Sequence, residues 1–168
     1  GIMHQEMPQG DAQGRMHGFQ LWANLPSSLK MTAPRYQDVP GAAIPEVTDD
    51  DGTRVRVVCG EFWGKKGPIE GVAADPRDLD RDVPPGKRKT LKVEVERHAF
   101  AYVFEGDGKF AYSSKPFGVL TEKQVGGEAI LFREPVGDRS LVLFDSGAEV
   151  TVQAGAPGIR FQLVSGQP

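Results

Sequence analysis

The feature that most constrains this chain is a series of short segments in which apolar and polar residues alternate. Thr90–Val95 (TLKVEV) follows a Pro-Pro-Gly sequence and alternates strictly. His98–Glu105 (HAFAYVFE), which precedes Gly-Asp-Gly, is apolar on both faces, which predicts a central strand. Side chains of a strand point alternately to opposite faces, so this period of two predicts β-strands. The glycine and proline breaks predict turns, and Gly-Asp-Gly predicts a hairpin turn. Many short strands at close spacing favour an all-β sandwich or barrel.

The remaining strands are expected from the same pattern. Arg77–Asp82 (RDLDRD) alternates in sign, which predicts an exposed strand or a sheet edge. One short helix is expected near Ser27–Lys30, where prolines limit regular structure. Further strands are expected at Gly18–Asn24, Arg54–Cys59, within Ile69–Asp82, and at Ala129–Phe132, Ser140–Phe144, Glu149–Gln153 and Ile159–Val164.

Composition narrows the class of protein. The 168 residues are enough for a hydrophobic core, with 39% apolar and 26% charged residues. The formal net charge is −3, whereas nucleic-acid-binding domains carry an excess of basic residues. No direct nucleic-acid partner is therefore expected. No membrane-spanning run and no signal peptide are visible, and the single Cys59 excludes an internal disulfide. These features predict a cytoplasmic protein without a membrane partner, also nuclear if the source is a eukaryote.

The stretch PPGKRKTLKVEVERHAFAYVFEGDGKF resembles a cupin barrel. In cupins the strand after a Pro-Gly turn carries an H-x-H pair of metal ligands, but the matching positions here hold Val93-Glu94-Val95 or nearby residues. The resemblance therefore implies a cupin-type, jelly-roll-like β-barrel from about Arg54 to Val164 that has a packed interior and no metal. The alternative is any other β-barrel that contains a Pro-Gly turn.

The N-terminal segment resembles the pirin family. The family pattern G-[IL]-x-H-x-E-x-P is matched by GIMHQEMP, H-G-[LF]-Q-L-W-x-N-L by HGFQLWANL, and the last barrel strand by IRFQLVSGQP. Pirins are bicupins with a metal in the first barrel only. The resemblance implies that residues 1–38 are the end of a first, metal-binding cupin barrel, 39–53 a linker and 54–168 a second, metal-free barrel. It also implies a fragment that lacks the family's N-terminal part and C-terminal tail.

His4 and Glu6 are the candidate metal ligands. On a strand, residues i and i+2 face the same side, so an imidazole and a carboxylate converge on one ion. Nitrogen and oxygen ligands suit iron, manganese or nickel, and the resemblance implies iron held with two further histidines from a preceding segment. His17 is expected to be a buried hydrogen-bonding histidine, His98 a surface or barrel-mouth histidine, and Cys59 a small buried residue. No catalytic residue is identified in the chain itself.

Two classes of function follow from the resemblance. The first is a metal-dependent quercetin 2,3-dioxygenase, with a flavonol-like small molecule as substrate. The second is a metal-dependent binding protein, a co-regulator whose partners are transcription factors or metabolic enzymes. The fragment by itself is expected to be an inactive scaffold that binds iron weakly or not at all. It is also expected to form a homodimer through exposed strands, because unpaired strand edges recruit other chains.

Overall fold

The computed structural model describes residues 3, 5–111, 117–118, 136–145 and 147–167. The chain divides into two compact units, Gly1–Asp38 and Val39–Pro168. Each unit is described by itself below.

The second unit consists almost entirely of strands, which confirms the all-β prediction. Residues 39–53, expected as a linker, include the 3-10 helix η2 (Gly41–Ala43) and a first short strand. The strands are β1 (Glu46–Thr48), β2 (Arg54–Cys59), β3 (Glu61–Phe62), β4 (Lys65–Lys66), β5 (Arg77–Val83), β6 (Arg88–Lys92), β7 (His98–Ala111), β8 (Phe117–Gly118), β9 (Val136–Gly137), β10 (Ser140–Leu143) and β11 (Glu149–Gly166). The expected strand at Ala129–Phe132 lies outside the described residues.

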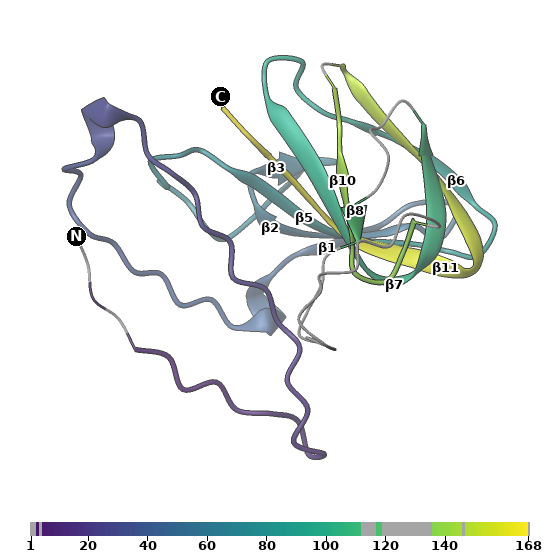
Figure 1. The fold of residues 1–168 in the computed structure, drawn as a ribbon, viewed down its shortest axis with the longest axis horizontal. Coiled ribbons are helices and arrows are strands. Elements are labelled where there is room, and N and C mark those ends of the chain that lie inside the picture. Colours follow the sequence, from purple (N-terminus) through teal and green to yellow (C-terminus); the bar gives the residue numbers. More distant parts are fainter. Residues whose placement is uncertain (1–2, 4, 112–116, 119–135, 146, 168) are drawn as a thin grey trace, which may run out of the picture. The chain divides into compact units, whose positions relative to one another are not determined.

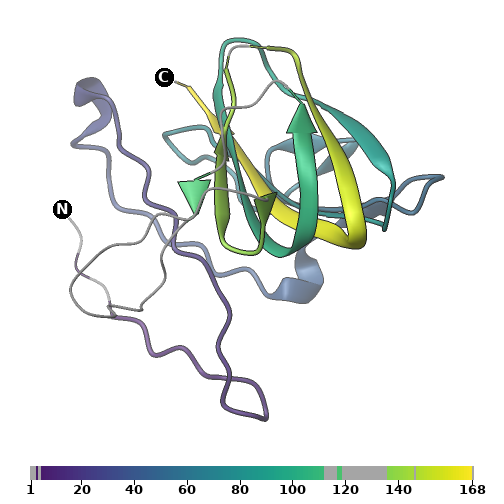
Figure 2. The ribbon, with the colours of Figure 1, turned by 45° about the vertical axis from the view of Figure 1, so that its right-hand side comes forward.

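The strands pair in the order β1-β2-β5-β11-β7-β10-β8, with β6 also paired to β11 and β9 to β7. All of these ladders are antiparallel. Strand β11 bends near its middle (Figures 1 and 2), where its register with β7 shifts between Ala154 and Ile159. Glu149–Gln153 and Ile159–Val164 are therefore one continuous strand instead of the two expected.

The core consists of the apolar side chains on the inner faces of these strands. Val57, Val103, Phe161 and Leu163 are almost completely buried, and Phe161 contacts Phe110 edge to face. The pattern along β2 and β11 is the alternation of buried and less buried residues that a half-covered sheet requires. Strand pairing and core burial therefore agree on which face is inside.

The predicted hairpin turn at Gly-Asp-Gly is wrong. Residues 106–108 lie inside the long strand β7, which continues to Ala111 and pairs there with β11. Gly106 has a φ of 74°, and a Cβ there would lie 2.1 Å from the carbonyl oxygen of Gly158. Glycine is needed at this position because two backbones approach closely. A glycine within a strand pattern can therefore mark a close backbone approach as well as a turn.

The prediction that Arg77–Asp82 forms an exposed or edge strand is also wrong. β5 lies between β2 and β11, paired on both sides. Its outer face carries Asp80, which accepts two hydrogen bonds from the Arg160 guanidinium, at 3.0 and 2.6 Å. Arg56 lies 3.7 Å from the same carboxylate. The aspartates on the outer face therefore bind cross-strand partners instead of protecting an edge.

The first unit contains one described element, the 3-10 helix η1 (Ser27–Leu29), which confirms the expected short helix. The expected strand at Gly18–Asn24 is absent. Alternation gives this segment an apolar and a polar face, but a strand also needs a neighbouring strand for its backbone N–H and C=O groups. No such neighbour is present among the described residues of this unit.

No helix in the described ranges is long and apolar enough to cross a membrane.

We expect the Asp80 pairing to contribute measurably to stability. Asp80→Ala should lower the free energy of unfolding by about 1–3 kcal/mol, because it leaves Arg56 and Arg160 partly buried without their carboxylate. Urea denaturation of Asp80→Ala, Arg160→Ala and the double variant should give a coupling energy above about 0.5 kcal/mol. The control is Asp138→Ala at an exposed position, with an expected change within about 0.5 kcal/mol. Additive effects of Asp80→Ala and Arg160→Ala would contradict the pairing.

We expect the 168-residue chain to self-associate. Met3, Met7, Trp22, Met31 and Tyr36 are each more than four-fifths exposed. Large exposed apolar side chains concentrated in one segment favour burial against another molecule, and a second copy offers the same surface. Sedimentation velocity at increasing concentration should show a dimer, which Trp22→Ser with Met31→Ser should weaken. A monomer at all concentrations would contradict this expectation.

Candidate functional site

The predicted metal ligands lie in the first unit. His4 falls outside the described residues. Glu6 is described, is exposed, and lies in no strand. The convergence of His4 and Glu6 on one metal ion therefore rests on their spacing in the sequence alone. It stays a prediction.

The other two histidines both lie at exposed positions. His17 is exposed, with its ring 5.6 Å from that of Phe19, so the expectation of a buried histidine is wrong. The reason is that the segment around it forms no strand and no core. His98 is exposed at the start of β7, which confirms a surface position. Among the described residues, no three His, Cys, Asp or Glu side chains form a group that could hold a metal ion.

His4 and Glu6 have the ligand types of an iron site, but two ligands are fewer than such a site uses. An imidazole and a carboxylate are the donors that non-haem iron uses, but that ion commonly takes two histidines and one carboxylate. With two protein ligands most of the coordination sphere is left to water, so such a site holds iron weakly. We therefore derive no catalytic step through a metal held by this chain alone.

The positions that resemble the cupin H-x-H pair, Val93-Glu94-Val95, hold no histidine. Val93 packs against the core, as expected for a filled interior. Glu94 forms ion pairs with Arg77 and Arg97. Val95 is 58% exposed, so the expectation that both valines fill the interior holds for Val93 only. The reason is that β6 ends at Lys92, before Val95 is reached.

Cys59 is a buried residue, as predicted. It is 7% exposed, and its Sγ lies 3.3 Å from the carbonyl oxygen of Ile69, close enough to donate a hydrogen bond. Burial, and then the nearby charge of Asp78, raise the pKa of the thiol above its usual range. A thiol with a raised pKa is a poor nucleophile and a poor metal ligand at neutral pH.

The most unusual polar side chain of the second unit was missed by the sequence analysis. Arg81 is completely buried, the largest side chain among the fully buried residues. It lies on the inner face of β5, opposite Val55 of β2 and Phe161 of β11. The sequence contained an indication of this burial, because Arg81 shares one face of the strand with the apolar residues Leu79 and Val83.

The Arg81 guanidinium is covered by an aromatic ring. Its Cζ lies 4.3 Å from the ring centroid of Phe62, a distance at which a cation is attracted to the ring face. Burial lowers the pKa of Arg81 to about 9. Because this value is above 7, the side chain carries its positive charge at neutral pH. A charge is therefore held inside an otherwise apolar core.

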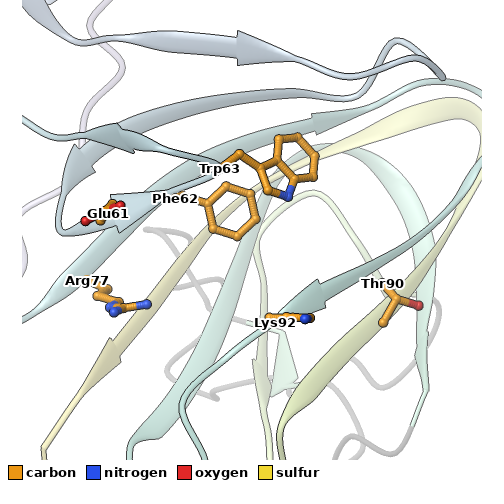
Figure 3. A pocket seen from close by; sticks show the side chains of 6 residues that line it. All are labelled: Glu61, Phe62, Trp63, Arg77, Thr90 and Lys92. Carbon is orange, nitrogen blue, oxygen red and sulfur yellow. The ribbon is translucent and has the colours of Figure 1, made fainter.

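A surface pocket of about 600 Å³ is lined in part by Phe62. Figure 3 shows the rings of Phe62 and Trp63 side by side, with the side chains of Arg77, Lys92 and Thr90 below them and Glu61 to one side. The two ring centroids are 4.7 Å apart. The complete lining is Glu61, Phe62, Trp63, Arg77, Thr90 and Lys92. The rings of Phe62 and Trp63 make this pocket suitable for a flat molecule. Lys92 and Arg77 contribute positive charge and Glu61 negative charge, and Arg77 is paired with Glu94.

The strand order and the antiparallel pairing define a cupin-type β-barrel. A quercetin 2,3-dioxygenase structure from Acinetobacter baumannii aligns with a TM-score of 0.65 over 88% of this chain and 44% of that chain, at 23% identity. At that identity the alignment supports the fold alone.

No family model matches the chain, but individual relatives do. A pirin-like protein of Caulobacter vibrioides is 44% identical over 115 residues, which are 68% of this chain and 41% of that protein. A pirin-like protein of Arabidopsis thaliana is 35% identical over 170 residues, covering all of this chain and 50% of the relative. A Pseudomonas aeruginosa protein, named provisionally as a quercetin 2,3-dioxygenase, is 32% identical over 94% of this chain and 53% of its own length.

The chain belongs to the pirin family. It spans about half the length of the curated relatives it matches.

Proposed function

We propose that the protein is a metal-dependent dioxygenase of the quercetin 2,3-dioxygenase type, with His4 and Glu6 among the ligands of an iron ion. The observation that carries the proposal is the His4-x-Glu6 pair within GIMHQEMP, in a chain that aligns over 94% of its length with the Pseudomonas aeruginosa relative. Because two ligands are too few, the remaining ligands are proposed to lie outside these 168 residues.

The residues of this chain have a limited role in that function. When bound, iron would supply the redox chemistry by which a flavonol reacts with molecular oxygen. The Glu6 carboxylate is exposed. It is therefore accessible to a metal ion whose other ligands come from other parts of a longer protein. The described residues of the second unit contain no cluster of three His, Cys, Asp or Glu side chains that could hold a metal ion, so the proposal assigns this unit no metal ligand.

The test is oxygen uptake with quercetin by the longer protein that contains this segment, loaded with iron(II). We expect stoichiometric iron and oxygen consumption that depends on quercetin. His4→Ala and Glu6→Ala should each lower metal affinity by at least about tenfold and lower oxygen uptake with it. The matched control is His98→Ala, an exposed histidine of the second barrel that should leave both unchanged.

Two results would contradict the proposal. Iron-loaded protein that consumes no oxygen with quercetin would favour the alternative role, metal-dependent binding of a regulatory or metabolic protein. Stoichiometric iron in the isolated 168-residue chain, measured by metal analysis, would show that its own residues complete the site. We expect substoichiometric iron in that chain.

A further inference from the structure

The interior of the second barrel contains polar groups that are buried and unsatisfied. In the described part of the chain, the buried side-chain nitrogen and oxygen atoms without a hydrogen-bond partner are Nε, Nη1 and Nη2 of Arg81 and Oγ1 of Thr53. Both residues are completely buried. Buried polar groups are normally hydrogen-bonded, so two such residues in one small barrel need an explanation.

The strand register indicates how the two residues are related. Arg81 is opposite Val55 in the register of β2 and β5. Thr53 precedes Val55 by two residues, so continuing the alternation of β2 by one step places its side chain on the face of Val55 and Arg81. The main chain of Thr53 is fixed by Asp49 and Asp51, whose carboxylates accept hydrogen bonds from its N–H. The side-chain hydroxyl of Thr53 has no hydrogen-bond partner in the described part of the chain.

Other partly buried cations of this unit show how the chain normally balances such charges. Lys89 forms ion pairs with Asp49 and Asp51, and Arg97 with Asp75 and Glu94. Arg81 is more buried than either and has only the face of the Phe62 ring. A well-packed apolar side chain of similar volume is often at least as stable as a buried charge. Retaining arginine at this position is therefore costly unless its charge is used.

We propose that Arg81 is the anchor of a site for a small aromatic carboxylate in the interior of the second barrel. A guanidinium binds a carboxylate with two parallel N–H···O bonds, which would satisfy the donors of Arg81. The Thr53 hydroxyl, which has no partner in the described part of the chain, can donate a further hydrogen bond. The aromatic part of the ligand fits the pocket beside Phe62 and Trp63, which Arg77 and Lys92 also line.

The hairpin of β3 and β4 controls access to Arg81. Phe62 of β3 lines the pocket, and its ring covers the Arg81 guanidinium. β3 and β4 pair with each other and belong to a separate two-stranded sheet. Gly60, Trp63 and Gly64 have φ values of 89°, 45° and 70° around this hairpin. Displacing it breaks no ladder of the main sheet and connects the pocket with Arg81.

The experiment uses benzoate as the probe and Trp63 as the reporter. The chain has two tryptophans, so Trp22→Phe leaves Trp63 as the only one. We expect a saturable change in Trp63 fluorescence and a rise in Tm with benzoate concentration, because ligand binding stabilises the folded state. Benzamide, which has the same ring without the charge, should produce neither effect.

Variants of Arg81 decide the assignment. Arg81→Met should abolish the benzoate response and raise the Tm of the unliganded protein. Arg81→Lys, which keeps the charge but loses the two-pronged geometry, should weaken binding at least tenfold and serves as the readout if Arg81→Met does not fold. The control is Arg139→Met, at an exposed arginine in the turn before β10, which should bind benzoate as the unmodified protein does.

Three results would overturn the proposal. The first is no saturable response to benzoate, and the second is an equal response in the Arg81 variants. The third is saturable binding of inorganic phosphate without binding of benzoate, which would indicate a general oxyanion site instead of one for aromatic carboxylates.

Discussion

The pairing of strand β11 with three other strands is the constraint on which the rest of the second unit depends. The first part of β11 pairs with β6 and the end of β7, and its last part pairs with β5 and the start of β7. The change occurs around residues 154–159, where the close approach of Gly106 to Gly158 lets the strand bend. One 18-residue strand therefore joins both parts of the barrel and fixes which faces are inside.

The position of β5 between β2 and β11 explains the surroundings of the charged residues on both of its faces. On the outer face, Asp80 lies between Arg56 and Arg160 of the neighbouring strands. On the inner face, Arg81 is surrounded by core residues of the same two strands. Strand β5 thus contains both a carboxylate in a cross-strand ion pair, which we expect to contribute to stability, and a buried cation, which we expect to oppose it. Only the second requires a functional explanation.

Much of the fold could be predicted from local sequence, and the failures share one cause. The alternation in RVRVVC and HAFAYVFE predicted β2 and the first part of β7 because both strands have one face in the core. The Gly-Asp-Gly turn, the edge position of β5 and the strand at Gly18–Asn24 were wrong. Each depends on which distant segment lies alongside, and local patterns do not contain that information.

The candidate sites show the same division. His4 and Glu6 could be selected because their spacing matches a family pattern, while Arg81 looked like one charge among several. Its burial follows from the pairing of β5 on both sides, although the apolar neighbours Leu79 and Val83 gave a hint of the inward face. The exposure of His17 and Trp22 was not predicted, because the apolar pattern was taken to imply a covering sheet.

We propose that the metal donors lie in the first unit and that the second unit is stable without a metal. Amide hydrogen exchange of the 168-residue chain, measured with and without iron(II), tests this separation most directly. The account predicts strong protection at the centres of β5, β7 and β11 under both conditions, because their amides are paired inside the sheet. It also predicts that any effect of iron is confined to residues 1–38. Iron-dependent protection within residues 39–168 would contradict it.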